Sequence, residues 1–260
     1  MRAHKPSGAE LFESTYQSLF GPRWKTLKEA LLKEREPVPF LNGLVKPYFL
    51  DQGSILAAET LPIQEGDTVL DMCAAPGGKS LVLESRLKGT GRLVCNDRSQ
   101  DRRGRLKRVI EEHVPEAWRS SISVTGHDAT RWGLFEGQVY DKILLDAPCS
   151  SERHVLTDPK ALGEWSPARP KHLAIQQFAM LCAALEAVKV GGLVLYSTCA
   201  LIAGEDEDVI AKLAKKRAGR FELVPTQVPL AENRTYGQII LPDTSGGRGP
   251  LYFCLLRRLS

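Results

Sequence analysis

The sequence has no pair of cysteines at the short spacing that structural zinc sites use. Its six cysteines stand apart, at positions 73, 95, 149, 182, 199 and 254, which argues against a metal site. A secretory signal is also missing, so we expect free thiols in a reducing compartment and no disulfide framework. The longest apolar helical stretch, residues 175–188, contains Gln and Glu and falls short of the roughly 20 residues that span a bilayer. We therefore expect no metal and no membrane partner.

The sequence also lacks a strong excess of charge of one sign. The formal net charge is +4, and basic residues gather in two runs, 101–108 and 215–220. Runs of this kind are typical of proteins with a polyanion partner, but each can equally be the solvated face of a helix. Charge alone leaves both interpretations open.

Short apolar runs alternate with helical patterns along most of the chain. Helices are predicted over 80–87, 101–112 and 171–188, and strands over 67–71, 92–97, 121–125, 141–146, 193–198, 221–224 and 251–256. The alternation predicts an α/β fold with a doubly wound, mostly parallel sheet. Ligands bind such sheets at the carboxyl ends of the strands, which would gather five side chains on one rim: Asp71, Asp97, Asp128, Asp146 and Cys199.

Residues 1–50 follow a different pattern from the rest of the chain. Two amphipathic stretches, 10–21 and 23–34, predict helices ahead of the first strand. We interpret residues 1–50 as a small helical N-terminal extension and residues 51–260 as the main domain.

A glycine-rich stretch, DMCAAPGGKS (71–80), links the first predicted strand to the following helix. It approximates the phosphate loop G-x-x-x-x-G-K-[ST], so an NTPase is one interpretation. However, Cys73 replaces the first glycine of that motif, and Pro76 has no N–H to donate to a phosphate. Asp97 follows the second strand, where an acid accepts ribose hydroxyls, and G-x-G-x-x-G is absent. An adenosine-bearing cofactor other than NAD is favoured.

Three motifs together resemble the signature of the Sun family of RNA (cytosine-5) methyltransferases: DMCAAPGGKS, LLDAPCSS (144–151) and LVLYSTCAL (193–201). The resemblance covers about residues 48–260 and implies a Rossmann-like class I methyltransferase domain that uses S-adenosylmethionine. Three further stretches, HDATRWG, ERHVL and GPLYFCLLRRLS, are similar to the branch that methylates mitochondrial small-subunit ribosomal RNA. A bacterial relative of that branch fits equally. A bacterial cytoplasmic protein and one of the mitochondrial matrix are both consistent with it.

Cytosine carbon 5 needs a covalent nucleophile at carbon 6 before it can attack a methyl group, so a cysteine is required. Cys149 and Cys199 both follow strand ends, and spacing alone does not say which of them attacks. The resemblance implies that Cys199 attacks, that Cys149 assists product release, and that Asp146 lies between cofactor and base. It also implies a set of cofactor-binding residues: Gly77, Gly78, Lys79, Asp97, Arg102, Asp128, Ala129 and Asp146.

The RNA partner is the least defined part of this interpretation. Ribosomal RNA is the expected substrate, and tRNA or a catalytically silent ribosome-assembly role are the alternatives. With no separate RNA-binding domain in view, the chain is expected to reach RNA through its basic surface, its N-terminal extension or a partner protein. Arg153 is a candidate for a phosphate contact, and His127 and His154 are candidates for either RNA contacts or structural hydrogen bonds.

Overall fold

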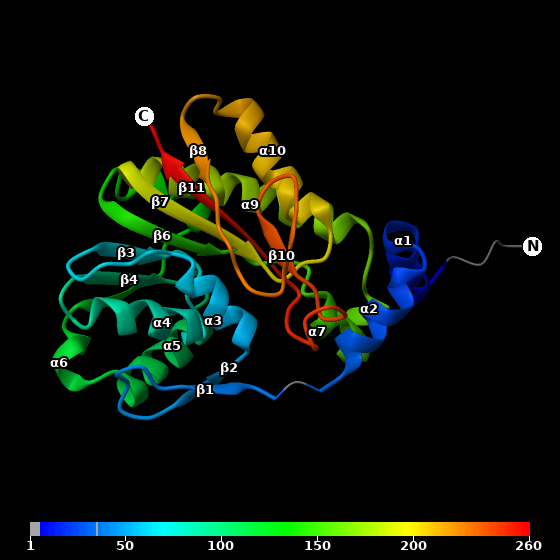
Figure 1. The fold of residues 1–260 in the computed structure, drawn as a ribbon, viewed down its shortest axis with the longest axis horizontal. Coiled ribbons are helices and arrows are strands. Elements are labelled where there is room, and N and C mark those ends of the chain that lie inside the picture. Colours follow the sequence, from blue (N-terminus) through cyan, green and yellow to red (C-terminus); the bar gives the residue numbers. More distant parts are fainter. Residues whose placement is uncertain (1–5, 35) are drawn as a thin grey trace, which may run out of the picture.

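The structure is a computed structural model that describes residues 6–34 and 36–260 (Figure 1). Its main sheet runs in the order β5-β4-β3-β6-β7-β11-β10-β9, and β8 pairs with β11. The strands are β3 (Thr68–Asp71), β4 (Arg92–Asn96), β5 (Ile122–Thr125), β6 (Tyr140–Asp146), β7 (Val188–Thr198), β8 (Phe221–Val224), β9 (Ala231–Asn233), β10 (Gln238–Ile240) and β11 (Leu251–Arg258).

The first five strands in sheet order are parallel, and the others pair antiparallel. From β3 the chain builds toward β5 on one side and then returns to add β6 and β7 on the other. The order therefore reverses between β3 and β6, and such a switch point opens a crevice at the carboxyl ends of the strands. Asp71 ends β3 and Asp146 ends β6, so both acids lie at this crevice.

Helices cover both faces of the sheet (Figure 1). One face packs α3 (Gln52–Glu59), α4 (Gly78–Leu87) and α5 (Gln100–His113), and the other packs α9 (Ala168–Ala187) and α10 (Glu207–Lys216). Successive side chains of β3 point to opposite faces of the sheet. Val69 packs in the core beneath α3, α4 and α5, and Leu70 packs in the core beneath α9 and α10. The shorter helices are α6 (Glu116–Arg119), η1 (Ala129–Leu134), α7 (Glu152–Thr157), α8 (Pro159–Gly163) and η2 (Ala203–Glu205).

The N-terminal segment forms two helices, α1 (Gly8–Phe20) and α2 (Arg23–Leu32), and a hairpin of β1 (Val38–Phe40) and β2 (Tyr48–Leu50). Ser7 starts α1 with a capping box closed by Glu10. Phe12 and Tyr16 are buried and join the same core as α9, and the Phe12 ring lies 5.2 Å from that of Trp165. The division of the chain at residue 50 stays a prediction.

Every strand expected from the sequence is present, and four were not expected: β1, β2, β9 and β10. Each of these has three residues, too few for an alternating pattern to stand out. Among the described residues, no helix is both long and apolar enough to cross a membrane. The same residues contain no cluster of His, Cys, Asp and Glu side chains arranged for a metal ion.

Candidate active site

The two motif cysteines meet at the carboxyl ends of neighbouring parallel strands. Cys149 lies in the loop 147–151 after β6, and Cys199 begins the loop 199–206 after β7; we call these the Cys149 loop and the Cys199 loop. Asp146 pairs with Ser197 in the ladder, and Ala147 N donates to Ser197 O at 2.8 Å. The two sulfur atoms are 2.8 Å apart.

The hydrogen bonds around the two thiols shift their pKa values in opposite directions. Either sulfur can be the donor between the two thiols, and Cys149 Sγ also accepts from the Cys199 N–H at 3.2 Å. Ser151 Oγ lies 3.2 Å from Cys199 Sγ as a second donor. The bond from Cys149 lowers the pKa of Cys199, with help from Ser151 and the charge of Lys79, while burial opposes the shift. The same bond raises the pKa of Cys149. Cys199 is therefore the thiol that ionises first.

Asp146 lies beside the thiols, held at both carboxylate oxygens. Lys79 Nζ donates to Oδ2 at 2.7 Å, and Ser197 Oγ donates to Oδ1 at 2.9 Å. Burial alone would lower the pKa of Lys79. The charge of Asp146 and its hydrogen bond outweigh that effect, so the pKa of Lys79 is raised. The Asp146 side chain remains 29% exposed. A protonated amine and a fixed carboxylate are thus presented together at the edge of the crevice.

Gly77 and Gly78 are required mainly by close packing within the protein. Gly77 has φ +122°, and a Cβ there would lie 3.0 Å from Val109 Cγ1 on α5. A Cβ at Gly78 would lie 3.1 Å from Tyr48 Cε1 on β2. The family resemblance implies that both glycines also border the cofactor, and Gly78 does line a cavity. In the structure, their close neighbours are side chains of α5 and of the hairpin.

A cavity of about 640 Å³ opens beside the glycine loop, over the ends of β4 and β5. It is lined by four of the predicted cofactor residues: Asp97, Arg102, Asp128 and Ala129. Asp97 is 5% exposed, accepts from Ser99 N at 2.9 Å and lies 3.4 Å from Arg102 Nη1. The hydroxyl of Thr130 donates to Asp128 and keeps its pKa below the usual value. Both carboxylates are therefore fixed acceptors.

A smaller cavity of about 170 Å³ shares Cys73 with the first and contains the glycine loop, Lys79 and Asp146. Asp71 also lines it, and its Oδ1 has no hydrogen-bond partner among the described residues. Ser80 Oγ donates to the other oxygen at 2.6 Å, yet burial raises the pKa of Asp71 to about 7. The sequence placed Asp71 on this rim without giving it a role. A buried carboxyl oxygen that lacks a donor is suited to receive one from a ligand.

The comparisons with known proteins agree with this geometry. A family model described as 16S rRNA methyltransferase RsmB/F matches residues 58–257. The chain belongs to this family. It is 36% identical over 238 residues to the 5-cytosine rRNA methyltransferase NSUN4 of Mus musculus, covering 84% of this chain and 61% of that one. It is also 33% identical over 187 residues to the ribosomal RNA small subunit methyltransferase F of Salmonella paratyphi A, covering 71% and 38%.

Solved structures show the same fold. PH0851 superposes with a TM-score of 0.83 at 21% identity, covering 98% of this chain and 70% of that one. NSun6 from Pyrococcus horikoshii, solved with SFG, gives 0.69 at 24% identity, covering 86% and 57%. The predicted Sun-family assignment and the Rossmann-like class I fold are confirmed. The chain spans about 61% of the length of the mouse and cow relatives.

Arg153 is hydrogen-bonded to backbone carbonyls within the protein. Its Nη1 donates to the carbonyls of Ala30, Leu31 and Lys33 at the end of α2. Its Nη2 donates to the carbonyls of Gly247 and Gly249. The guanidinium thus ties three distant segments together, and these bonds occupy donors that the phosphate contact considered from the sequence would need.

The two histidines considered for RNA contacts differ in their surroundings. The His127 ring stacks on Phe135 with centroids 4.1 Å apart, and its backbone N–H donates to Asn96. His154 is exposed, with Nε2 3.9 Å from Asp158. The structural interpretation therefore fits His127 well.

The two basic runs lie at opposite ends of the sheet. Run 101–108 is in α5, which starts directly after β4 beside the large cavity. Run 215–220 ends α10 and leads into β8, where Arg220 contacts Glu186 and the carbonyl of Ser260. The first run contributes Arg102 to the lining of that cavity.

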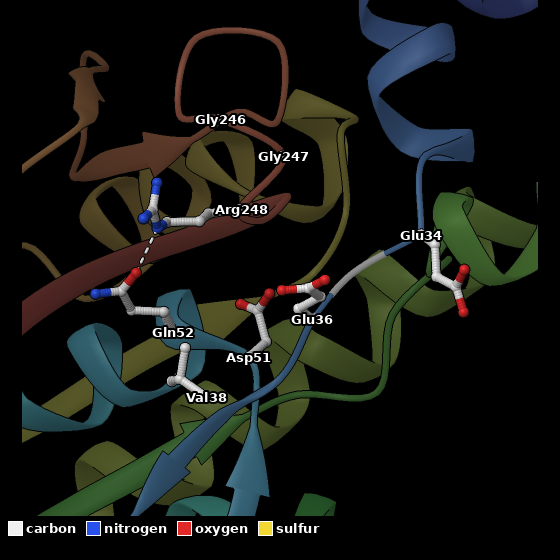
Figure 2. Close-up of a pocket in the computed structure, with 8 residues that line it drawn as sticks. All are labelled: Glu34, Glu36, Val38, Asp51, Gln52, Gly246, Gly247 and Arg248. Atoms are coloured by element: carbon white, nitrogen blue, oxygen red, sulfur yellow. Dashed lines mark hydrogen bonds between the residues drawn. The ribbon is translucent and has the colours of Figure 1, made fainter.

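A further cavity of about 380 Å³ has no predicted site residue in its lining (Figure 2). Glu34, Glu36 and Asp51 supply carboxylates to it, and Arg248 donates to Gln52 at 2.5 Å. These three carboxylates disfavour binding of a polyanion in this cavity.

Proposed function

We propose that the chain transfers a methyl group from S-adenosylmethionine to carbon 5 of a cytosine in ribosomal RNA, with Cys199 as covalent nucleophile. The observation that carries the proposal is the thiol pair, 2.8 Å between sulfurs, beside Asp146 and Lys79. The names of its relatives, which describe RNA cytosine-5 and ribosomal RNA methyltransferases, support the reaction and the substrate class.

The residues at the two connected cavities fit S-adenosylmethionine. Asp97 would accept the ribose hydroxyls, and Asp128 with Ala129 would border the adenine. The free oxygen of Asp71 would accept the amino group of the methionine part. When bound, the cofactor supplies a methyl group on a positively charged sulfur. Cys73, Pro76 and the family assignment all weigh against the NTPase alternative.

The chain's own residues then account for the chemistry on the base. The Cys199 thiolate adds to carbon 6, and nitrogen 3 takes a proton from the Asp146–Lys79 pair as electron density moves toward carbon 5. Carbon 5 takes the methyl group and afterwards loses its proton to a base. The sulfur–carbon 6 bond breaks as that proton leaves, which returns the Cys199 thiolate, and nitrogen 3 gives its proton back to the Asp146–Lys79 pair. Cys149, in contact with the leaving sulfur, assists this last step.

The relatives act on more than one class of RNA. A Danio rerio relative, 34% identical over 232 residues, is named as a mitochondrial tRNA (cytosine(34)-C(5))-methyltransferase. The relatives include mitochondrial and bacterial proteins, so the mitochondrial matrix and a bacterial cytoplasm both stay predictions. A partner protein that directs the chain to its RNA also stays a prediction.

Bisulfite sequencing of total RNA from a deletion strain tests the proposal. We expect one protected cytosine in small-subunit ribosomal RNA to become fully convertible, and restoration by the wild-type chain but not by Cys199→Ala. A lost site in tRNA would keep the reaction and change the substrate. No lost site in any RNA would favour the catalytically silent assembly factor instead, although both thiols and Asp146 are present.

RNA affinity is expected to depend on salt through the run in α5. Replacing Arg105, Lys107 and Arg108, all exposed, by Gln should flatten the slope of log affinity against log salt. Each lost phosphate contact lowers the slope by about 0.7 to 0.9. The matched control replaces Lys215 and Lys216, which lie in the other run, and should leave the slope unchanged. An equal effect of both sets would mean that position near the rim is irrelevant. Filter binding over a salt series gives the slopes.

A further inference from the structure

Two buried glutamates lie behind the thiol pair and have no part in the chemistry described above. Glu152 is the third residue after Cys149, and Glu205 is the sixth after Cys199. Both are 0% exposed. A buried carboxyl is costly unless its oxygens are hydrogen-bonded, so the partners of each glutamate indicate what it does.

Each glutamate binds the loop that carries the other thiol. Glu205, from the Cys199 loop, accepts from Ser150 N at 3.0 Å and also from Ser150 Oγ, next to Cys149. Glu152, which follows the Cys149 loop, accepts from Leu201 N at 3.2 Å, two residues after Cys199. The two contacts cross, so neither loop can shift without breaking a bond to the other.

Both contacts are anchored further away. Tyr16, fully buried in α1, donates its hydroxyl to Glu152 Oε1 at 2.6 Å. Gln177 of α9 donates to Glu205 Oε2 at 2.8 Å and to the carbonyl of Pro148 at 2.9 Å. Tyr16 thereby connects helix α1 to Glu152, 136 residues later in the sequence, and through Glu152 to the Cys199 loop.

We propose that Glu152 and Glu205 are positioning residues, Glu152 for Cys199 and Glu205 for Cys149, and that Tyr16 extends this brace to helix α1. The inference rests on the proposed function, because it assigns the two glutamates to the two thiol-dependent steps of that reaction. A displacement of the reacting sulfur by about 1 Å can lower the rate of a step by about 100-fold, so the two loops must be held in place.

Because each glutamate binds the loop that carries the other thiol, the two alanine variants should slow different steps. Glu152→Ala should slow formation of the covalent adduct by about tenfold or more, because the main chain after Cys199 loses its acceptor. Glu205→Ala should leave adduct formation closer to wild type but slow release, so that the adduct persists. A purely structural role would lower both steps together. Tyr16→Phe should resemble Glu152→Ala with a smaller loss.

Glutamine at position 152 distinguishes shape from charge. Burial raises the pKa of Glu152 to about 8, which favours the neutral acid near pH 7. A neutral acid and an amide have the same shape, and in both the oxygen can accept from Leu201 N while the OH or NH₂ group donates to the Tyr16 hydroxyl oxygen. Glu152→Gln should therefore restore adduct formation to within about twofold of wild type.

The experiment uses the full chain and a small-subunit ribosomal RNA transcript in two forms. A transcript with 5-fluorocytidine traps the adduct, because fluorine cannot leave as a proton, and the trapping rate reports the Cys199 step. An ordinary transcript reports turnover and persistent adduct on denaturing gels. Thermal melting and calorimetry with S-adenosylhomocysteine check folding and cofactor binding of each variant.

Matched controls separate the brace from a general loss of buried polar groups. Glu84→Ala removes another fully buried glutamate, which accepts from Gly89 N at 3.0 Å on the far side of α4. Tyr140→Phe removes another Tyr–Glu hydrogen bond, which is part-buried and lies at the opposite end of β6. Both should leave the ratio of trapping to release unchanged.

Equal loss of trapping and release in Glu152→Ala and Glu205→Ala would overturn the inference, as would a Glu152→Gln variant as slow as Glu152→Ala. Variants that match wild type in both steps would overturn it too. If wild type itself traps no adduct while binding S-adenosylhomocysteine, the proposed function fails first, and the inference fails with it. Tyr16→Phe and Glu152→Gln change few atoms, so they keep the test open if an alanine variant does not fold.

Discussion

Cys199→Ala is expected to abolish methylation and every covalent RNA adduct. Without a sulfur at this position, no bond forms to carbon 6, and carbon 5 stays too weak a nucleophile to take the methyl group. Turnover should fall by about 10⁴-fold or more, since the residue that forms the covalent bond is gone. The measurement is tritium transfer from labelled S-adenosylmethionine to the RNA, with gel analysis for the adduct.

The control for that variant is binding of S-adenosylhomocysteine and of RNA, both of which should remain near wild type. Cys182→Ala offers a second control, because Cys182 lies on α9 and packs against the core between that helix and the sheet. Residual adduct in Cys199→Ala would show that a second thiol can attack and would contradict the proposed role of Cys199 as the nucleophile.

Cys149→Ala is expected to give the opposite defect. Cys199 can still add to the base and the methyl group can still transfer, but the leaving sulfur has lost the thiol it contacts at 2.8 Å. A covalent protein–RNA species should therefore accumulate on denaturing gels while multiple turnover stops. A variant that turns over normally would remove Cys149 from the release step.

A pH series on Cys149→Ala adds a second signature. The bond from Cys149 is the leading cause of the lowered pKa of Cys199, so its loss should raise that pKa. The thiolate fraction rises with pH through this pKa, and adduct formation should follow it. The wild-type profile should thus reach its plateau at lower pH than the variant. Coincident profiles would mean that the hydrogen bond does not activate Cys199.

Much of the fold follows from local patterns in the sequence. Long runs such as 141–146 and 193–198 have the apolar content of buried parallel strands, and the structure confirms both within β6 and β7. The sequence also places Cys149 and Cys199 after strand ends. It does not show that β6 and β7 are neighbours, and this adjacency is what brings the sulfurs together.

Other parts of the site depend on contacts that no local pattern records. The lowered pKa of Cys199 follows from its contacts with Cys149 and Ser151, which lie 50 and 48 residues away in the sequence. Arg153 looked like a phosphate ligand because its carbonyl partners lie in segments about 95 to 120 residues away. The unpaired oxygen of Asp71 becomes visible only when all its neighbours are placed.

Peptide mapping of the trapped adduct tests the central claim most directly. Trypsin cuts after Lys142, Arg153, Lys189 and Lys212, so Cys149 and Cys199 fall in different peptides, 143–153 and 190–212. Wild-type chain is incubated with S-adenosylmethionine and a ribosomal RNA transcript containing 5-fluorocytidine, then digested with nuclease and trypsin for mass spectrometry. The account predicts a methylated fluorocytidine adduct on peptide 190–212. The same adduct on peptide 143–153 would contradict it.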